Sequence, residues 1–297
     1  MACRTRLAAS MKAAAFEYHA PRTLTEATEL LARYRDTDVR VLAGGQSLLP
    51  AMAFRLATPA HLVDINEIRE LSSLTVERTH LVVRACVRHR AFERPCETGP
   101  LGRLLARVVR EIAHYPIRTR GTVCGSLANA DPSSEWCLVA VTLGAELTAI
   151  GNRGRRAIQG SDWFKGLMTT AIEPDELLLE VRFPRLPEGT LFGFQEFARR
   201  AGDFALAMAL VTFRLESGAI VDAHVGLGGV EATPRRLELV EKALNGGRPS
   251  ANVYSAAADS AASALHPLTD GRYDAEYRRD LARTMIRRAL QEASPAT

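Results

Sequence analysis

The chain has 297 residues, of which 47% are hydrophobic and 24% are charged, and its formal net charge is +4 at pH 7. This length and apolar content suffice for two compact domains with cores of their own, and they exclude a disordered or fibrous chain. The arginines are spread along the sequence and build no basic stripe, so we expect no nucleic-acid partner. No stretch approaches the ~20 consecutive apolar residues of a transmembrane segment.

The N-terminus and the cysteines indicate the compartment. Residues 1–11 hold too short an apolar run for a secretory signal, and we expect a ragged start there. The five cysteines form no Cys-x-x-Cys pair, and their scatter argues against a metal site or an iron–sulfur cluster on this chain. An odd, scattered set indicates reduced thiols and therefore a cytoplasmic protein. The cysteines are Cys3, Cys86, Cys96, Cys124 and Cys137.

The N-terminal part follows a strand–helix–strand pattern. Apolar spacing predicts a helix over 26–34, with Thr25 as its N-cap. Strands are predicted at 39–43, which ends on a Gly-Gly pair, and at 62–65. Together they predict a small βαβ-type unit with a glycine loop at the end of a strand.

Strands and helices are predicted to alternate from there to a break at 184–189. Residues 81–85 predict a strand and residues 101–112 a helix with one apolar face, while the strongly apolar segment 138–150 is expected to enter a sheet. The break contains two prolines and a glycine, which marks a domain boundary.

An α+β unit is predicted beyond the break. The segments 193–215 and 219–228, together with the helices that follow from residue 235 onward, suggest this α+β unit. One of these helices, over 251–265, is rich in alanine, and the last, over 273–293, is amphipathic and rich in arginine.

Two glycine-rich stretches point to a ligand. One is Val41-Leu-Ala-Gly-Gly-Gln-Ser-Leu-Leu-Pro50, and the other is Thr119-Arg-Gly-Thr-Val-Cys-Gly-Ser-Leu-Ala-Asn-Ala-Asp-Pro132. A diphosphate needs many N–H donors at short range, and small residues let the main chain approach that closely. A single Gly-Gly pair more often serves a tight turn. The two stretches together predict a site for one extended dinucleotide.

Both stretches belong to a longer series of motifs. They contain Ala-Gly-Gly-x-Ser-Leu-x-Pro at 43–50 and Gly-Thr-Val-x-Gly-Ser-Leu-Ala-x-Ala-Asp-Pro at 121–132. The series continues with Asp175-Glu-Leu-Leu-Leu-Glu-Val-Arg-Phe-Pro184, Arg199-Arg-Ala-Gly-Asp-Phe-Ala205, Gly226-Leu-Gly-Gly-Val230 and Tyr277-Arg-Arg-Asp-Leu-Ala282. Over roughly residues 12–292 it resembles the FAD-binding medium subunit of molybdenum hydroxylases, of the carbon monoxide dehydrogenase and xanthine dehydrogenase family.

The resemblance implies an α+β fold. Two subdomains of a PCMH/vanillyl-alcohol-oxidase-type flavin fold would hold FAD between them, and a C-terminal α+β domain with an antiparallel sheet and helices would complete the subunit. On this chain the FAD-binding domain would be 12–184, with subdomains of about 12–66 and 67–184. The C-terminal domain would be 190–293.

The resemblance also assigns cofactor contacts. The two loops would surround the diphosphate and the neighbouring sugar, Asp131 and Glu135 would contact the ribitol or ribose, and Leu178 and Phe204 would flank the isoalloxazine ring. No catalytic residue and no metal ligand is assigned to this chain. The loop residues are Ala43, Gly44, Gly45, Gln46, Ser47 and Leu48 in the first loop, and Thr122, Val123, Cys124, Gly125 and Ser126 in the second.

Three positions depart from the commonest family pattern. Cys124 stands where a glycine is usual, Glu135 where an aspartate is frequent, and Phe204 where an aromatic residue with a hydroxyl sometimes lies. Cys124 is small enough to fit, but a positive φ there would cost energy. A thiol beside a flavin can be redox-active, yet no partner cysteine is near in the sequence, which favours a packing role.

The resemblance implies an oxidoreductase made of three kinds of subunit. A large subunit with a molybdopterin-type molybdenum cofactor would oxidise the substrate, and a small subunit with [2Fe-2S] clusters would pass electrons to FAD on this chain. An external acceptor would remove them, and the assembly would be a dimer of heterotrimers. Two alternatives stay open: a self-contained FAD-dependent oxidase or dehydrogenase of the same fold, and a non-redox module that holds another phosphate ligand.

Overall fold

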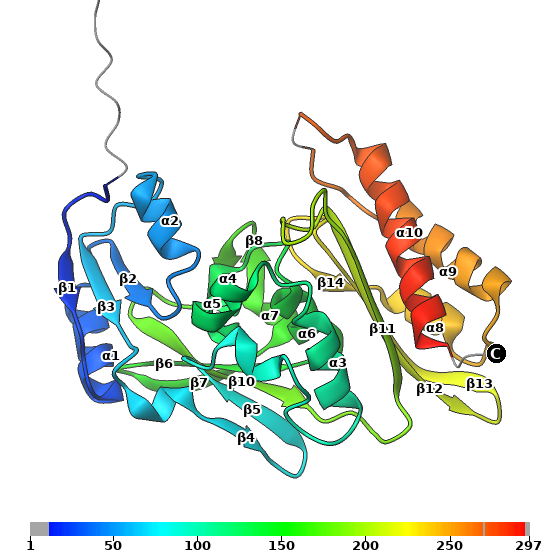
Figure 1. Ribbon diagram of the computed structural model, residues 1–297, viewed down its shortest axis with the longest axis horizontal. Helices are drawn as coiled ribbons and strands as arrows, with labels where there is room; N and C mark the ends of the chain where they lie inside the picture. Colours follow the sequence, from blue (N-terminus) through cyan, green and yellow to red (C-terminus); the bar gives the residue numbers. More distant parts are fainter. Residues whose placement is uncertain (1–11, 270, 295–297) are drawn as a thin grey trace, which may run out of the picture.

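The computed structural model describes residues 12–269 and 271–294. The ragged start expected at 1–11 lies outside the described residues. Figure 1 shows three packed units in chain order. The first has a three-stranded sheet, the second a five-stranded sheet with a small hairpin, and the third a four-stranded sheet covered by the last helices.

The first unit is a parallel sheet in the order β1-β3-β2. Parallel pairing places the carboxyl ends of β2 and β3 on one edge of the sheet, and the first glycine loop starts at that edge. The predicted βαβ-type unit is therefore confirmed. Its elements are β1 (Glu17–His19), α1 (Leu24–Arg33), β2 (Val39–Leu42), α2 (Leu48–Ala53) and β3 (His61–Asp64).

Helix α1 starts earlier than predicted. Its N-cap is Thr23, whose Oγ1 accepts a hydrogen bond from the Glu26 N–H at 3.2 Å. The Glu26 carboxylate in turn accepts from the Arg22 N–H at 2.8 Å. The assignment of Thr25 as N-cap is wrong: Thr23 caps the helix, and the glutamate three residues on binds the N–H of the residue just before the cap, in a variant of the capping box.

The second unit is built on a sheet in the order β4-β5-β10-β6-β7, antiparallel throughout. Its strands are β4 (Leu74–Val76), β5 (His80–Arg84), β6 (Glu146–Gly151), β7 (Gly154–Gln159) and β10 (Glu176–Pro184), with a hairpin of β8 (Phe164–Gly166) and β9 (Thr169–Thr170). Its helices are α3 (Pro100–Val108), α4 (Tyr115–Arg120), α5 (Val123–Asn129), α6 (Glu135–Leu143) and α7 (Gly160–Trp163), with 3-10 turns at Arg69–Ser72 and His89–Phe92.

The apolar segment 138–150 does not enter the sheet as one piece, as the sequence suggested. Its first half is the end of α6, which stops at Gly144 with a left-handed φ of +65°. Its second half is β6. Almost all residues of α6 are buried, so the helix shows no alternation between an apolar and a polar face. Without that alternation, its sequence pattern resembles that of a buried strand.

The third unit is an antiparallel sheet of β11 (Leu191–Phe197), β12 (Ala207–Glu216), β13 (Ala219–Gly228) and β14 (Arg235–Arg236), with α8 (Glu238–Leu244), α9 (Ala251–Ser263) and α10 (Ala275–Ala293). In Figure 1 the last two helices lie along one face of this sheet. Strand β12 is buried on both faces: Val211 and Phe213 share a core with α10, whereas Met208 and Leu210 join the core of the second unit. None of the helices described here is long and apolar enough to cross a membrane.

Candidate functional site

The two glycine loops, far apart in the sequence, touch each other between β2 and α5 (Figure 1). A Cβ atom on Gly44 would lie 2.6 Å from the main-chain oxygen of Arg120 and 2.6 Å from the Cα atom of Gly121. Side chains do not tolerate contacts this short, so only a glycine allows the approach. Gly45 is also conformationally required, since its φ is +71°.

A layer of buried side chains supports the second loop from behind. A Cβ atom on Gly121 would lie 2.6 Å from His89 Nε2, so this glycine is held between Gly44 and an imidazole ring. Trp136 Nε1 donates to His89 Nδ1 at 2.9 Å, and the His89 N–H donates to the Gly121 oxygen at 3.0 Å. Burial, assisted by nearby arginines, lowers the pKa of His89 to about 3, so the ring is neutral. The second loop therefore has no room to move away from the first.

A chain of polar contacts also ties the loops together. Asn66, which follows β3, donates from Nδ2 to the Ala43 oxygen at 2.8 Å and accepts at Oδ1 from Arg88 at 2.5 Å. Arg88 donates further to the main-chain oxygen of Arg120. Asp64 orients Asn66 by accepting its main-chain N–H at 2.9 Å. Asn66 and Arg88 thus link the end of β2 to the start of the second loop.

The loops leave main-chain donors without protein partners. Within residues 12–269 and 271–294, none of the five amides from Gly44 to Leu48 has a hydrogen-bond acceptor, and neither have the amides of Thr122 and Cys124. The amino end of α5 adds its partial positive charge at the second loop. A set of seven amides on two touching loops fits a ligand with two linked phosphates, because phosphate oxygens accept such bonds. The diphosphate of FAD is a group of this kind.

In the first loop the side chains offer few groups to a ligand, whereas the main chain offers its amides. Gln46 turns back and donates from Nε2 to the Gly44 oxygen at 3.0 Å, which stabilises the loop. Ser47 is exposed, whereas Ala43 and Leu48 are half-buried. A ligand at this loop would therefore be held mainly by main-chain amides, and the predicted cofactor contacts of its residues stay a prediction.

In the second loop the side chains of Val123 and Cys124 point into the core. Thr122 caps α5 by accepting the Gly125 N–H at 3.0 Å, and Cys124 Sγ donates to the Val83 oxygen at 3.5 Å. Cys124 is helical and its φ is not positive, so the strain expected for a side chain at this position does not arise. Burial raises the pKa of its thiol, which keeps the sulfur protonated and supports a packing role.

Beyond the second loop, Ser133 links Asp131 to the segment that carries Phe204. Asp131 accepts the Ser133 N–H at 2.8 Å, and Ser133 Oγ donates to the oxygen of Ala205, the neighbour of Phe204. The Phe204 side chain is 74% exposed, which leaves its ring face available to a planar partner. Leu178 differs from these residues, because its side chain lies in the core of the second unit, on the strand against which α5 packs.

Glu135 belongs to a group of carboxylates with Glu196 of β11 and Glu111. Burial raises the pKa of Glu135 to about 7, and burial together with the charges of Glu135 and Glu111 raises the pKa of Glu196 to about 9. Glu196 Oε2 has no hydrogen-bond partner in the part of the chain that the structure describes. Near neutral pH this pair therefore retains a proton, which suits hydrogen bonding to sugar hydroxyls.

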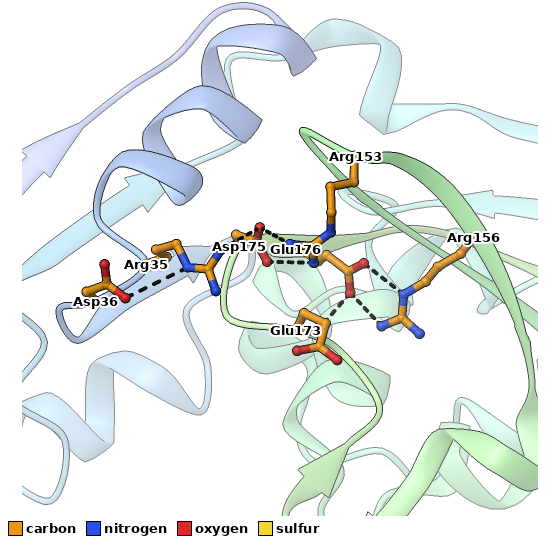
Figure 2. Close-up of polar contacts among 7 residues, drawn as sticks. All are labelled: Arg35, Asp36, Arg153, Arg156, Glu173, Asp175 and Glu176. Carbon is orange, nitrogen blue, oxygen red and sulfur yellow. Dashed lines mark hydrogen bonds and ion pairs between the residues drawn. The ribbon is translucent and has the colours of Figure 1, made fainter.

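A network of ion pairs joins the first unit to the second (Figure 2). Asp175, buried at the start of β10, pairs with Arg153 at 3.1 Å and with Arg35, beyond the end of α1, at 3.7 Å. Next to it, Arg156 donates twice to the Glu176 carboxylate, at 2.6 and 2.8 Å. Burial acts to raise the pKa of Glu176, but these hydrogen bonds outweigh it and the pKa is lowered. The network holds together the two units that carry the two glycine loops.

Several residues that build the site were not predicted from the sequence. Asn66, Arg88, His89 and Trp136 hold the loops in place, yet none belongs to either glycine-rich stretch. Only Asn66 could have been found from the sequence. It follows the predicted strand at 62–65, whose carboxyl end in a βαβ-type unit lies beside the strand that leads into the first loop. His114, the residue before α4, lies against Gly202: a Cβ atom on Gly202 would be 2.5 Å from the His114 ring.

Comparison with known proteins places this geometry in a family. Residues 14–186 match the family described as "FAD binding domain in molybdopterin dehydrogenase", and residues 192–293 match the "CO dehydrogenase flavoprotein C-terminal domain". The chain is 35% identical to the nicotine 6-hydroxylase medium subunit of Paenarthrobacter nicotinovorans, covering 97% of this chain and 100% of the relative. It is 37% identical to the caffeine dehydrogenase subunit beta of a Pseudomonas species, with 96% of each chain covered.

The fold is similar as well. A chain of carbon monoxide dehydrogenase from Hydrogenophaga pseudoflava, in a form that lacks the Mo-pyranopterin moiety of its molybdenum cofactor, matches with a TM-score of 0.90 and 35% identity over 95% of this chain and 98% of that one. The class is therefore an oxidoreductase subunit with a FAD-binding domain and a C-terminal domain built on an antiparallel sheet, which confirms the expected fold. The chain belongs to the FAD-binding medium subunits of molybdenum hydroxylases, the family that its motifs resemble.

Proposed function

We propose that this chain is the electron-transfer subunit of a heterotrimeric molybdenum hydroxylase. The observation that carries the proposal is the pair of touching loops, whose seven amides have no acceptor among the described residues, in a chain whose residues 14–186 match the FAD-binding family. The amides of the first loop and those of Thr122 and Cys124 would hold the FAD diphosphate. Asp131 and Glu135 would contact the sugar hydroxyls, and Phe204 and Leu178 would flank the ring.

The chemistry of the proposed complex is divided among its subunits. When bound, FAD accepts electrons singly and releases them in pairs to an external acceptor. A small subunit with [2Fe-2S] clusters would supply these electrons, and a large subunit with a molybdopterin-type cofactor would oxidise the substrate. The relatives are named for nicotine, caffeine and carbon monoxide, although the fold is shared, so we infer that substrate choice lies on the large subunit.

Exposed apolar side chains just after the first loop support an assembly. Leu49, Phe54 and Leu56 are 44%, 65% and 83% exposed, in α2 and the turn that follows it. Several exposed apolar side chains within a few residues are typical of a surface that another protein covers. We propose that the complex is a dimer of heterotrimers, as in the implied family assembly.

The first experiment is a visible spectrum of the purified chain, followed by one of the complex co-expressed with the neighbouring genes. Flavin bands in the chain, joined by iron–sulfur absorption in the complex, are expected. A colourless chain that does not take up added FAD would contradict the proposal and favour a non-redox phosphate module.

Flavin reduction separates the two redox alternatives. The chain alone should not be reduced by nicotine, caffeine or carbon monoxide, whereas its flavin should be reduced when a chemically reduced small subunit is added. Reduction of the isolated chain by an organic substrate would instead support a self-contained oxidase or dehydrogenase.

A further inference from the structure

We propose that Glu17, His19 and His61 form a transition-metal site of the zinc type on the first unit. Within the described ranges, these residues are the one group of three whose possible ligand atoms all converge. Glu17 and His19 lie on β1, and His61 is the first residue of β3. The parallel register pairs Glu17 with His61, and His19 stands two residues along β1 on the same face as Glu17.

The distances between the three ligand atoms suit one small ion. His19 Nε2 and His61 Nδ1 are 3.2 Å apart, Glu17 Oε2 is 3.4 Å from His61 Nδ1, and it is 4.0 Å from His19 Nε2. Ligands at ~2.0–2.1 Å from a tetrahedral ion are separated by about 3.3 Å. Two of the three distances already match, and the exposed Glu17 side chain can close the third by a small rotation.

The donor set indicates which ion is preferred. Two imidazoles and one carboxylate suit Zn²⁺ and neighbouring transition metals, whereas Mg²⁺ and Ca²⁺ prefer oxygen ligands alone. The imidazoles are held in place, since Tyr34 stacks on His61 with ring centroids 3.7 Å apart and on His19 at 5.1 Å. Both imidazoles are mostly buried, with side chains 19% and 12% exposed. Glu17 lies open to solvent, which leaves a fourth position to water.

The site would stabilise the sheet and would leave flavin chemistry unchanged. His61 is the first residue of β3 and so lies at the amino ends of the parallel strands. The first glycine loop follows β2 and so lies at their carboxyl ends, on the other side of the same sheet. A metal at this position would join β1, which has only three residues and lies at the edge of the sheet, to the central strand. The competing interpretation is a plain hydrogen bond between the two histidines, which needs a proton and no metal.

Metal binding to the full chain tests the proposal. Protein without a histidine tag is stripped with a chelator and titrated with Zn²⁺ against a chromophoric indicator, and with Co²⁺, whose absorption reports tetrahedral coordination. We expect one equivalent of Zn²⁺ with a Kd of about 1 μM or below. His61→Gln should weaken this binding at least about 100-fold, and His266→Gln, at an exposed site in the third unit, should not.

Glu17→Gln keeps the test decisive if His61→Gln fails to fold, because the Glu17 side chain is 70% exposed. It should also weaken binding, while the FAD content of every variant stays normal. Absence of stoichiometric Zn²⁺ binding to the wild-type chain, or equal binding by the Glu17 and His266 variants, would overturn the metal site and leave the histidine hydrogen bond.

Discussion

The contact between the two glycine loops leads to a quantitative prediction for Gly44→Ala. The new Cβ atom would lie 2.6 Å from two main-chain atoms, where ordinary contact begins at about 3.4 Å, so the loops must separate by about 0.8 Å. Gly121 cannot yield, because His89 lies directly behind it. The strain is therefore expressed as displacement of the first loop away from the second, which His89 holds in place.

The cost to FAD binding follows from the donors of the second loop, which a diphosphate held by the displaced first loop no longer reaches. The second loop offers the amides of Thr122 and Cys124, and a hydrogen bond to a charged group contributes about 1.5 kcal/mol or more. Loss of both corresponds to about 3 kcal/mol, or at least about 100-fold in Kd. Titration of the apoprotein with FAD, followed by the quenching of flavin fluorescence, measures this Kd.

Gly166→Ala is the matched control. No atom lies within 4 Å of its added Cβ, and its φ is not positive, so neither Kd nor thermal stability should change. Gly45→Val is less informative: φ is +71° there and the side chains of Leu49 and Leu42 crowd the position, so the substitution would strain the loop itself. A folded Gly44→Ala protein with the wild-type Kd for FAD would refute the idea that the loop contact builds the site.

Further predictions concern the residues around the loops. Asp175→Asn should lower the free energy of unfolding by about 1–3 kcal/mol in urea denaturation because it breaks the network that joins two units, whereas Asp36→Asn, at a 95% exposed side chain, should change nothing measurable. The raised pKa of Glu196 means that the folded protein holds a proton that the unfolded chain releases above pH 4.5, so this group contributes stability at low pH that is lost as the pH rises towards about 9. Glu196→Gln should therefore be more stable than wild type at pH 9 and similar at pH 5 in thermal unfolding, and an unchanged pH profile would contradict this reasoning. Phe204→Ala should alter the visible spectrum of bound flavin and leave unfolding within about 0.5 kcal/mol of wild type, since the ring is mostly exposed; a large loss of stability would show a packing role instead.

The sequence predicts the parts of this protein that depend on local pattern. The strand that ends at the Gly-Gly pair, the βαβ-type unit and the final amphipathic helix follow from periodicity and glycine placement. The apolar spacing places the start of α1 two residues too late, because Thr23 and Thr25 are both good N-caps and only Glu26, three residues after Thr23, decides between them. The sequence does not show that the first half of 138–150 is helical, because full burial removes the periodic signal on which helix prediction relies.

What local pattern cannot show is contact between distant segments. Nothing near Gly44 in the sequence indicates that its Cβ position is occupied by the main chain of Gly121. Arg88 and Asn66 likewise join the loops through side chains that have ordinary neighbours in the sequence. Such contacts become visible only once the fold brings the carboxyl edge of the first sheet against α5.

The proposed recognition by main-chain amides accounts for the tolerance of departures from the family pattern. Cys124 replaces a common glycine, yet its amide has no acceptor among the described residues while its sulfur donates to the Val83 oxygen in the core. A side chain at this position matters only if it forces a positive φ or enters the loop surface, and Cys124 does neither. The proposed site then requires a fixed residue type at only a few positions, above all Gly44, so the loops can diverge in sequence while the backbone proposed to bind the ligand is retained. This is consistent with a TM-score of 0.90 at 35% identity to the carbon monoxide dehydrogenase chain.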